Sequence, residues 1–201
     1  MSYFPKLNNI VSKDNLRNNI TYAIVIDNYI VGTDAFKLVK ISLDEFVGSE
    51  DEKENLNGKA LHFKSIKILS QKKWKSLYFD KKGVKLYKDL YKDNGMEEPD
   101  LFIEYDAKLI NKEKREFKTK GGEKFIYPDY EMIFRNSIEL ADKNDYCNNR
   151  VINAEYLYHI QQAMELYALE ISYDGKMAFV TRPKFWSDKI DAIGLIMETK
   201  I

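Results

Sequence analysis

The sequence of 201 residues has few of the residue types that build metal, disulfide or catalytic sites. Its one cysteine, Cys147, cannot form an internal disulfide, which predicts a reducing compartment, the cytoplasm. Its two histidines, His62 and His159, lie far apart in the sequence, and neither has a cysteine or paired carboxylates at metal-ligand spacing. We therefore expect no metal ion and no other cofactor.

Long apolar runs and the common catalytic motifs are also missing. The first ten residues, MSYFPKLNNI, lack the apolar core of a signal peptide, and no run approaches membrane-spanning length, so no membrane partner is expected. No glycine-rich segment matches a nucleotide-binding fingerprint, and Cys147 has no base beside it. One interpretation makes Asp34 and Asp129 a catalytic carboxylate pair. The favoured interpretation is that both are turn-forming aspartates next to strands. The sequence predicts a protein that is not an enzyme.

Charged residues are abundant, and they are unevenly distributed. The 32 basic and 32 acidic residues cancel. Residues 59–85 hold nine lysines and one acid, residues 108–124 hold seven basic residues and three glutamates, and residues 44–54 hold six acids and one lysine. Clustered cations can present a positive face to a polyanion even in a neutral protein. The alternative interpretation is that these lysines cover solvated helix faces and loops.

The first part of the chain predicts an α+β unit with antiparallel strands. Two β-rich runs, 20–26 and 29–43, flank Asp27 and Asn28, which is typical of a hairpin. A short helix capped by Ser12 is expected at 12–19, a loop at the acidic segment 44–58, and a helix at 61–79. Two further strands are expected within 81–91 and 100–113.

The second part is expected to repeat half of this order after a connector rich in aromatic residues. The segment 135–149 is largely polar, and a helix follows with Asn153 as its N-cap and an apolar stripe through Leu157, Ile160, Met164 and Tyr167. Asp174-Gly175 predicts a second hairpin, and the last ten residues predict a strand. We expect two units, residues 1–118 and 119–201, each with helices on one face of an antiparallel sheet.

Three segments together resemble the bacterial DNA polymerase III β subunit, the sliding clamp. YIVGTDAFKL (29–38) is similar to the clamp strand that ends in Ala-Thr-Asp-Gly-His-Arg-Leu. KFIYPDYEMIF (124–134) is similar to its inter-domain Phe-Pro-Asp-Tyr segment, and residues 151–175 and 192–201 are similar to its final helix, strands and Met-Pro-Met-Arg-Leu tail. The resemblance implies a DNA clamp-like fold, with one full clamp domain followed by a truncated second one.

The resemblance also implies a function. Sliding clamps are processivity factors that bind duplex DNA without sequence specificity as rings. They recruit DNA polymerases and other proteins with a clamp-binding motif through a hydrophobic pocket. By position, that pocket would use Ile20, Thr33, Ala35, Phe36, Lys37, Leu38, Pro128, Ile133, Leu195 and Met197. The same resemblance implies a homo-oligomer and double-stranded DNA as partners.

Several features leave alternatives open. The clamp's Gly-His-Arg is replaced by Ala35-Phe36-Lys37, and its Met-Pro-Met by Met197-Glu198-Thr199. Alternating apolar residues of a terminal strand, such as Leu195 and Met197, are also typical of a plain core.

The lysines expected to face DNA phosphates are Lys64, Lys67, Lys72, Lys73 and Lys75. The alternative functions are an interaction module of clamp fold that no longer encircles DNA and, more remotely, an unrelated ligand-binding protein or enzyme.

Overall fold

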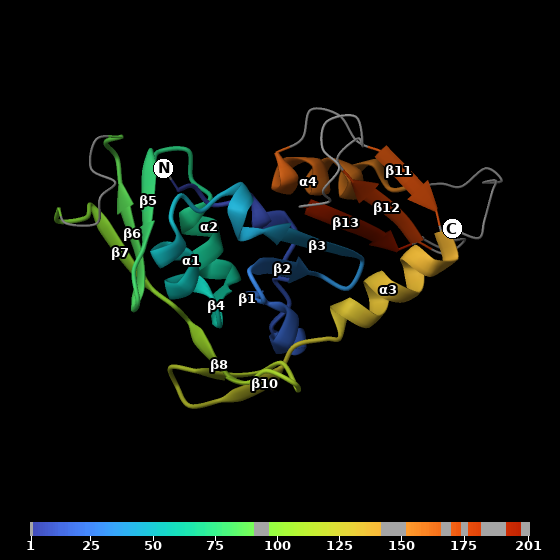
Figure 1. The fold of residues 1–201 in the computed structure, drawn as a ribbon, viewed down its shortest axis with the longest axis horizontal. Helices are drawn as coiled ribbons and strands as arrows, with labels where there is room; N and C mark the ends of the chain where they lie inside the picture. Colours follow the sequence, from blue (N-terminus) through green and yellow to red (C-terminus); the bar gives the residue numbers. More distant parts are fainter. Residues whose placement is uncertain are drawn as a thin grey trace.

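A computed structural model describes residues 2–90, 97–141, 152–165, 170–173, 177–181 and 192–197. These residues form two antiparallel sheets and several short helices (Figure 1). The strands are β1 (Tyr22–Ile26), β2 (Tyr29–Thr33), β3 (Lys37–Ser42), β4 (Lys59–His62), β5 (Ser76–Phe79), β6 (Gly83–Tyr87), β7 (Leu101–Glu104), β8 (Ala107–Asn111), β9 (Glu116–Thr119), β10 (Lys124–Ile126), β11 (Glu170–Tyr173), β12 (Met177–Thr181) and β13 (Ala192–Met197). The α-helices are α1 (Glu50–Leu56), α2 (Phe63–Leu69), α3 (Tyr130–Ala141) and α4 (Ala154–Met164), and the 3-10 helices are η1 (Leu7–Asn9), η2 (Asn15–Ile20) and η3 (Leu43–Glu45).

The larger sheet has ten strands in the order β10-β9-β8-β4-β1-β2-β3-β13-β12-β11, and the smaller one has the order β5-β6-β7. Every pair of neighbouring strands is antiparallel. The expectation of an α+β fold with antiparallel sheets is therefore confirmed.

Side-chain alternation buries both faces of the central strands. Ala23 and Val25 of β1 join one apolar cluster, whereas Tyr22, Ile24 and Ile26 join a second cluster on the opposite face. The first cluster also receives side chains from α1, α2 and α4 and from β5 and β6. Figure 1 accordingly shows α1 and α2 between the small sheet and the large one.

Helix α3 lies on the other side of the large sheet. Its residues Tyr130 and Phe134 are buried in the second cluster, together with Phe117 and Phe125 of the β9–β10 hairpin. The expectation that all helices share one face is therefore wrong for α3. The reason is that the end of the aromatic connector, where no helix was expected, places Tyr130 and Phe134 one helical turn apart.

The two predicted units are joined in one sheet, because β3 pairs with β13 from Lys37↔Ile196 to Ile41↔Ala192. The expected boundary between residues 118 and 119 falls inside β9. The division of the chain into domains stays a prediction.

Several expected elements were correct. Residues Asp27 and Asn28 have φ of 52° and 64°, the left-handed geometry that a two-residue hairpin needs, and they connect β1 to β2. The Asn153 side chain accepts a hydrogen bond from the Glu155 backbone N–H, which confirms it as the N-cap of α4. β11 and β12 pair as expected, although Asp174, Gly175 and Tyr167 lie outside the described residues.

Other expected elements were wrong. The acidic segment 44–58 contains α1, because Ser49 caps a helix there. The segment 61–79 is not one helix: α2 ends at Leu69, and Leu77 and Phe79 belong to β5, where they alternate with half-buried Tyr78. Asp14, not Ser12, caps the short helix near the N-terminus, which is the 3-10 helix η2. In the described part of the chain, no helix has the length and apolar character needed to span a membrane.

Candidate functional site

An apolar cavity of about 200 Å³ lies where β2, β3, β13, the aromatic connector and α3 meet. Its lining is almost wholly apolar. The residues that line it are Ile20, Thr33, Ala35, Lys37, Leu38, Tyr127, Pro128, Tyr130, Ile133 and Leu195. Eight of these ten are residues that the clamp resemblance assigns to the partner pocket.

One wall of the cavity is the tight turn between β2 and β3. The Thr33 hydroxyl donates to the Lys37 carbonyl (2.8 Å) and accepts from the Ala35 N–H (3.1 Å). The Asp34 carboxylate accepts from the backbone N–H groups of Phe36 and Lys37, both at 3.0 Å, and pairs with the Lys37 ammonium. Side-chain bonds therefore hold the turn, including Ala35 at φ 76°.

The opposite wall comes from the connector and α3. Tyr127 is fully buried, and its hydroxyl donates to the Val31 carbonyl across 3.4 Å. Asp129 accepts from the Met132 N–H at 3.1 Å, as an N-cap of α3 does, and forms an ion pair with Arg115 at 3.0 Å. These contacts fix the path of the chain on both sides of Pro128.

The buried phenols of this wall stay protonated. Burial raises the pKa of Tyr127 far above its ordinary value, and the neighbouring Tyr130 adds to the rise. Burial is also the main cause of the raised pKa of Tyr130, and the nearby Glu131 and Asp27 carboxylates raise that pKa further. These two tyrosines therefore contribute neutral side chains to this wall of the cavity near neutral pH.

One residue assigned to the pocket, Phe36, does not line the cavity. Phe36 is half exposed, stacks on Tyr156 of α4 with ring centroids 6.2 Å apart, and lines a neighbouring polar cavity. Met197 is the last residue of β13, and its side chain lies outside the described residues. Tyr127 and Tyr130, in contrast, line the cavity although the resemblance did not assign them. The signal that pointed to them was the concentration of aromatic residues in the connector.

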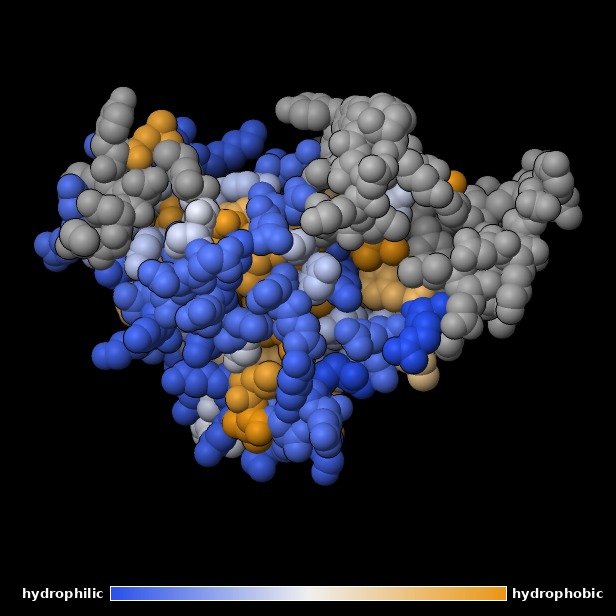
Figure 2. Space-filling view, viewed as in Figure 1, coloured by the Kyte–Doolittle hydropathy of each residue, from blue (hydrophilic) through white to orange (hydrophobic). Residues whose placement is uncertain are grey.

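The lysines expected to contact DNA are all exposed. Lys64 and Lys67 lie on α2, whereas Lys72, Lys73 and Lys75 lie on the loop that follows it, so the five are not on one helix as expected. The Lys73 ammonium is 4.5 Å from the centre of the Trp74 ring. Figure 2 shows a predominantly hydrophilic surface over α1 and α2.

The two histidines lie in different surroundings. His62 caps α2, and burial lowers its pKa. His159 lies on α4 beside Glu155, with 3.8 Å between Nε2 and the carboxylate, and burial again lowers the pKa. No group of three or more histidine, cysteine or acidic side chains able to hold a metal ion is found within the described ranges.

Comparisons of the chain with protein-family models, with curated proteins and with solved structures give no match. The relationship to sliding clamps therefore depends on the residues and on the cavity that they line, and it stays a prediction.

Proposed function

We propose that this chain is a sliding-clamp-like accessory protein of DNA replication, which binds duplex DNA without sequence specificity and recruits partner proteins through the apolar cavity. One observation carries the proposal. Residues from three distant parts of the chain, 20–38, 128–133 and 195, were assigned to one pocket by resemblance, and eight of them line one cavity. The clamp-like fold, the absence of enzymatic activity, a cytoplasmic location and a homo-oligomeric state belong to the same proposal.

The chemistry of the cavity suits a short peptide with an apolar anchor. Such sites have apolar walls with a few polar groups at the lip, and a buried leucine or aromatic side chain dominates the binding energy. Here Leu38, Ile133 and Leu195 supply apolar walls, and Thr33 and Lys37 supply polar groups. Because the turn is held by its own hydrogen bonds, little order has to be gained when a partner binds.

Substitution of Ile133 tests the proposal. Ile133 lines the cavity from α3 and is only partly buried, whereas the adjacent Met132 is exposed and does not line it. Ile133→Ala should weaken binding of a fluorescent clamp-motif peptide by about 1–3 kcal/mol, and Met132→Ala should leave it unchanged. Thermal unfolding of both variants controls for loss of structure. Equal peptide affinity in all three proteins would overturn the proposal.

The small second unit favours an alternative function. In its described part it contributes α4 and the three strands β11, β12 and β13 beyond the connector and α3, whereas a clamp ring is built from six full domains. An interaction module that keeps the pocket without encircling DNA is therefore the second candidate. Light scattering together with retention on circular and linear DNA separates the two. A monomer that binds the peptide and is not retained on circular DNA identifies the module.

A further inference from the structure

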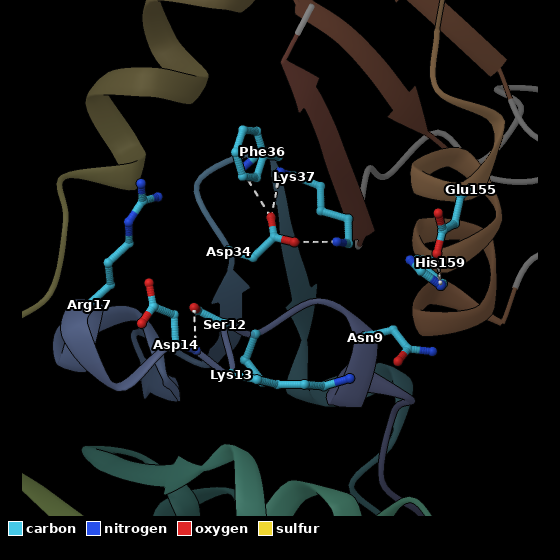
Figure 3. Close-up of a pocket in the computed structure, with 11 residues that line it drawn as sticks. Asn9, Ser12, Lys13, Asp14, Arg17, Asp34, Phe36, Lys37, Glu155 and His159 are labelled. Carbon is cyan, nitrogen blue, oxygen red and sulfur yellow. Dashed lines mark hydrogen bonds and ion pairs between the residues drawn. The ribbon is translucent and has the colours of Figure 1, made fainter. Parts of the chain in front are cut away.

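A second cavity, of about 470 Å³, lies between the η1–η2 segment, the turn after β2 and helix α4 (Figure 3). It shares Lys37 with the apolar cavity, but most of its lining is charged or polar. Of its lining residues, Phe36 and Lys37 are also assigned to the partner pocket by the clamp resemblance, and none is a lysine expected to contact DNA.

The carboxylates of this cavity already interact with groups of the protein. Asp34 accepts from two backbone N–H groups and pairs with the Lys37 ammonium. Asp14 caps η2 by accepting from the Leu16 N–H at 2.9 Å. Glu155 lies 3.8 Å from Nε2 of His159.

Several donors of the same cavity have no such partner. Within the described residues, no acceptor contacts the Lys13 ammonium or the Asn9 amide nitrogen, and Nδ1 of His159 is buried without a hydrogen-bond partner. Figure 3 shows the side chains of Lys13 and Lys37 extending towards the side of the cavity where α4 carries His159. A buried polar atom without a partner is costly, and a ligand that accepts hydrogen bonds removes the cost.

The balance of charge depends on His159. Lys13, Arg17 and Lys37 match Asp14, Asp34 and Glu155 in number, so the lining is neutral while the imidazole is neutral and carries one positive charge once it is protonated. Burial is the main cause of the lowered pKa of His159, and the positive charges of Lys37 and Lys13 lower it further. The carboxylates of Glu155 and Asp34 act in the opposite direction and raise this pKa. An anion placed among these cations would offset their effect and favour the imidazolium.

We propose that this cavity binds an oxyanion, the phosphate or carboxylate group of a small ligand, between Lys13, Lys37 and His159, and takes up a proton on His159 as it does so. Nδ1 then donates to the oxyanion while Nε2 keeps its proton beside Glu155. The inference does not depend on the peptide pocket or on DNA binding.

The test follows the two histidine resonances by NMR during titration with inorganic sulfate, whose charge is constant over the range in which imidazole titrates. We expect a saturable shift of the His159 signals, a rise of the His159 pKa, and tighter binding at lower pH. His62, on the far side of β1, is an internal control and should not respond. Parallel titrations with inorganic phosphate and with succinate distinguish a phosphate ligand from a carboxylate one.

Variants make the test specific. Lys13 is exposed, so Lys13→Gln should fold normally and should bind sulfate about tenfold more weakly, the effect of one charge-assisted contact. Lys64→Gln, an exposed lysine on α2, is the matched control and should bind as the unmodified protein does. His159→Gln should remove the pH dependence. Equal shifts of both histidines, or unchanged affinity in Lys13→Gln, would show a general salt effect and overturn the proposal.

Discussion

Ile160 of α4 packs directly on Gly194 of β13. A Cβ atom added to Gly194 would lie 2.4 Å from Cγ2 and 3.1 Å from Cδ1 of Ile160, and both residues are buried. The glycine thus sets how closely the helix approaches the sheet, on the strand that joins the second unit to β3.

Replacing this glycine should destabilise the protein. In Gly194→Ala the new methyl group overlaps a β-branched side chain that cannot turn away, so we expect a loss of about 1–3 kcal/mol in the free energy of unfolding, measured by chemical denaturation. Ile160→Ala alone should cost about 2–5 kcal/mol. The double variant should be more stable than the sum of the two losses predicts, because the methyl group at residue 194 then occupies vacated space. Strict additivity would contradict the contact.

Glu52 of α1 is a second structural determinant. Its buried carboxylate accepts from the hydroxyls of Ser2 and Ser49 and from the Phe79 N–H of β5, at 3.0–3.1 Å. Glu52→Gln removes the charge and leaves a donor facing these donors, which should cost about 1–3 kcal/mol of unfolding free energy. Asp51→Asn removes a charge in the same helical turn at an exposed position and should change stability little. Equal losses in the two variants would assign the effect to the helix terminus alone.

Reversal of exposed lysines tests the proposed DNA face. The triple variant Lys64→Glu, Lys67→Glu and Lys72→Glu should lose retention on duplex DNA, because each lost phosphate contact also removes counterion release. Retention of the unmodified protein should fall steeply with salt and should not depend on DNA sequence. A comparison variant reverses Lys112, Lys114 and Lys118 in the other basic segment. If only that variant loses retention, the DNA face lies on the β8–β9 turn and β9 instead.

Buried phenols predict instability in alkaline solution. Burial raises the pKa of Tyr105, Tyr127 and Tyr130 in the folded protein, whereas in the unfolded chain these groups ionise near 10. Above that pH the folded state holds more protons, so the free energy of unfolding should fall as pH rises. Tyr127→Phe should show a shallower fall, measured by denaturation at a series of pH values. Tyr158→Phe, at an exposed position, should keep the slope of the unmodified protein.

Short sequence signals predicted the hairpins because the residues of a tight turn determine its geometry by themselves. Asp27 and Asn28 tolerate positive φ, so the turn between β1 and β2 follows from two residues alone. Helix α1 was missed because its acidic composition suggested a loop. Ser49 and Glu52 have the Ser-x-x-Glu spacing that marks a helix start, and the Ser49 hydroxyl accepts from the Glu52 N–H and donates to its carboxylate.

The placement of α3 and the walls of the cavity could not be derived from local signals. Tyr130 and Phe134 belong to a core whose other members include residues of β1, β2, β9 and β10, so their burial depends on distant strands. The resemblance to clamps supplied eight lining residues because it relates segments far apart in sequence. It did not supply Tyr127 or Tyr130.

The pairing of β3 with β13 also determines when the protein can finish folding during its synthesis. Leu38 lies opposite Leu195, and nearly the whole chain between them must leave the ribosome before they meet. Until then one side of β3 is an unpaired strand edge with exposed backbone groups, a surface on which nascent chains aggregate. The apolar cavity is completed at the same moment, because Leu195 is one of its walls.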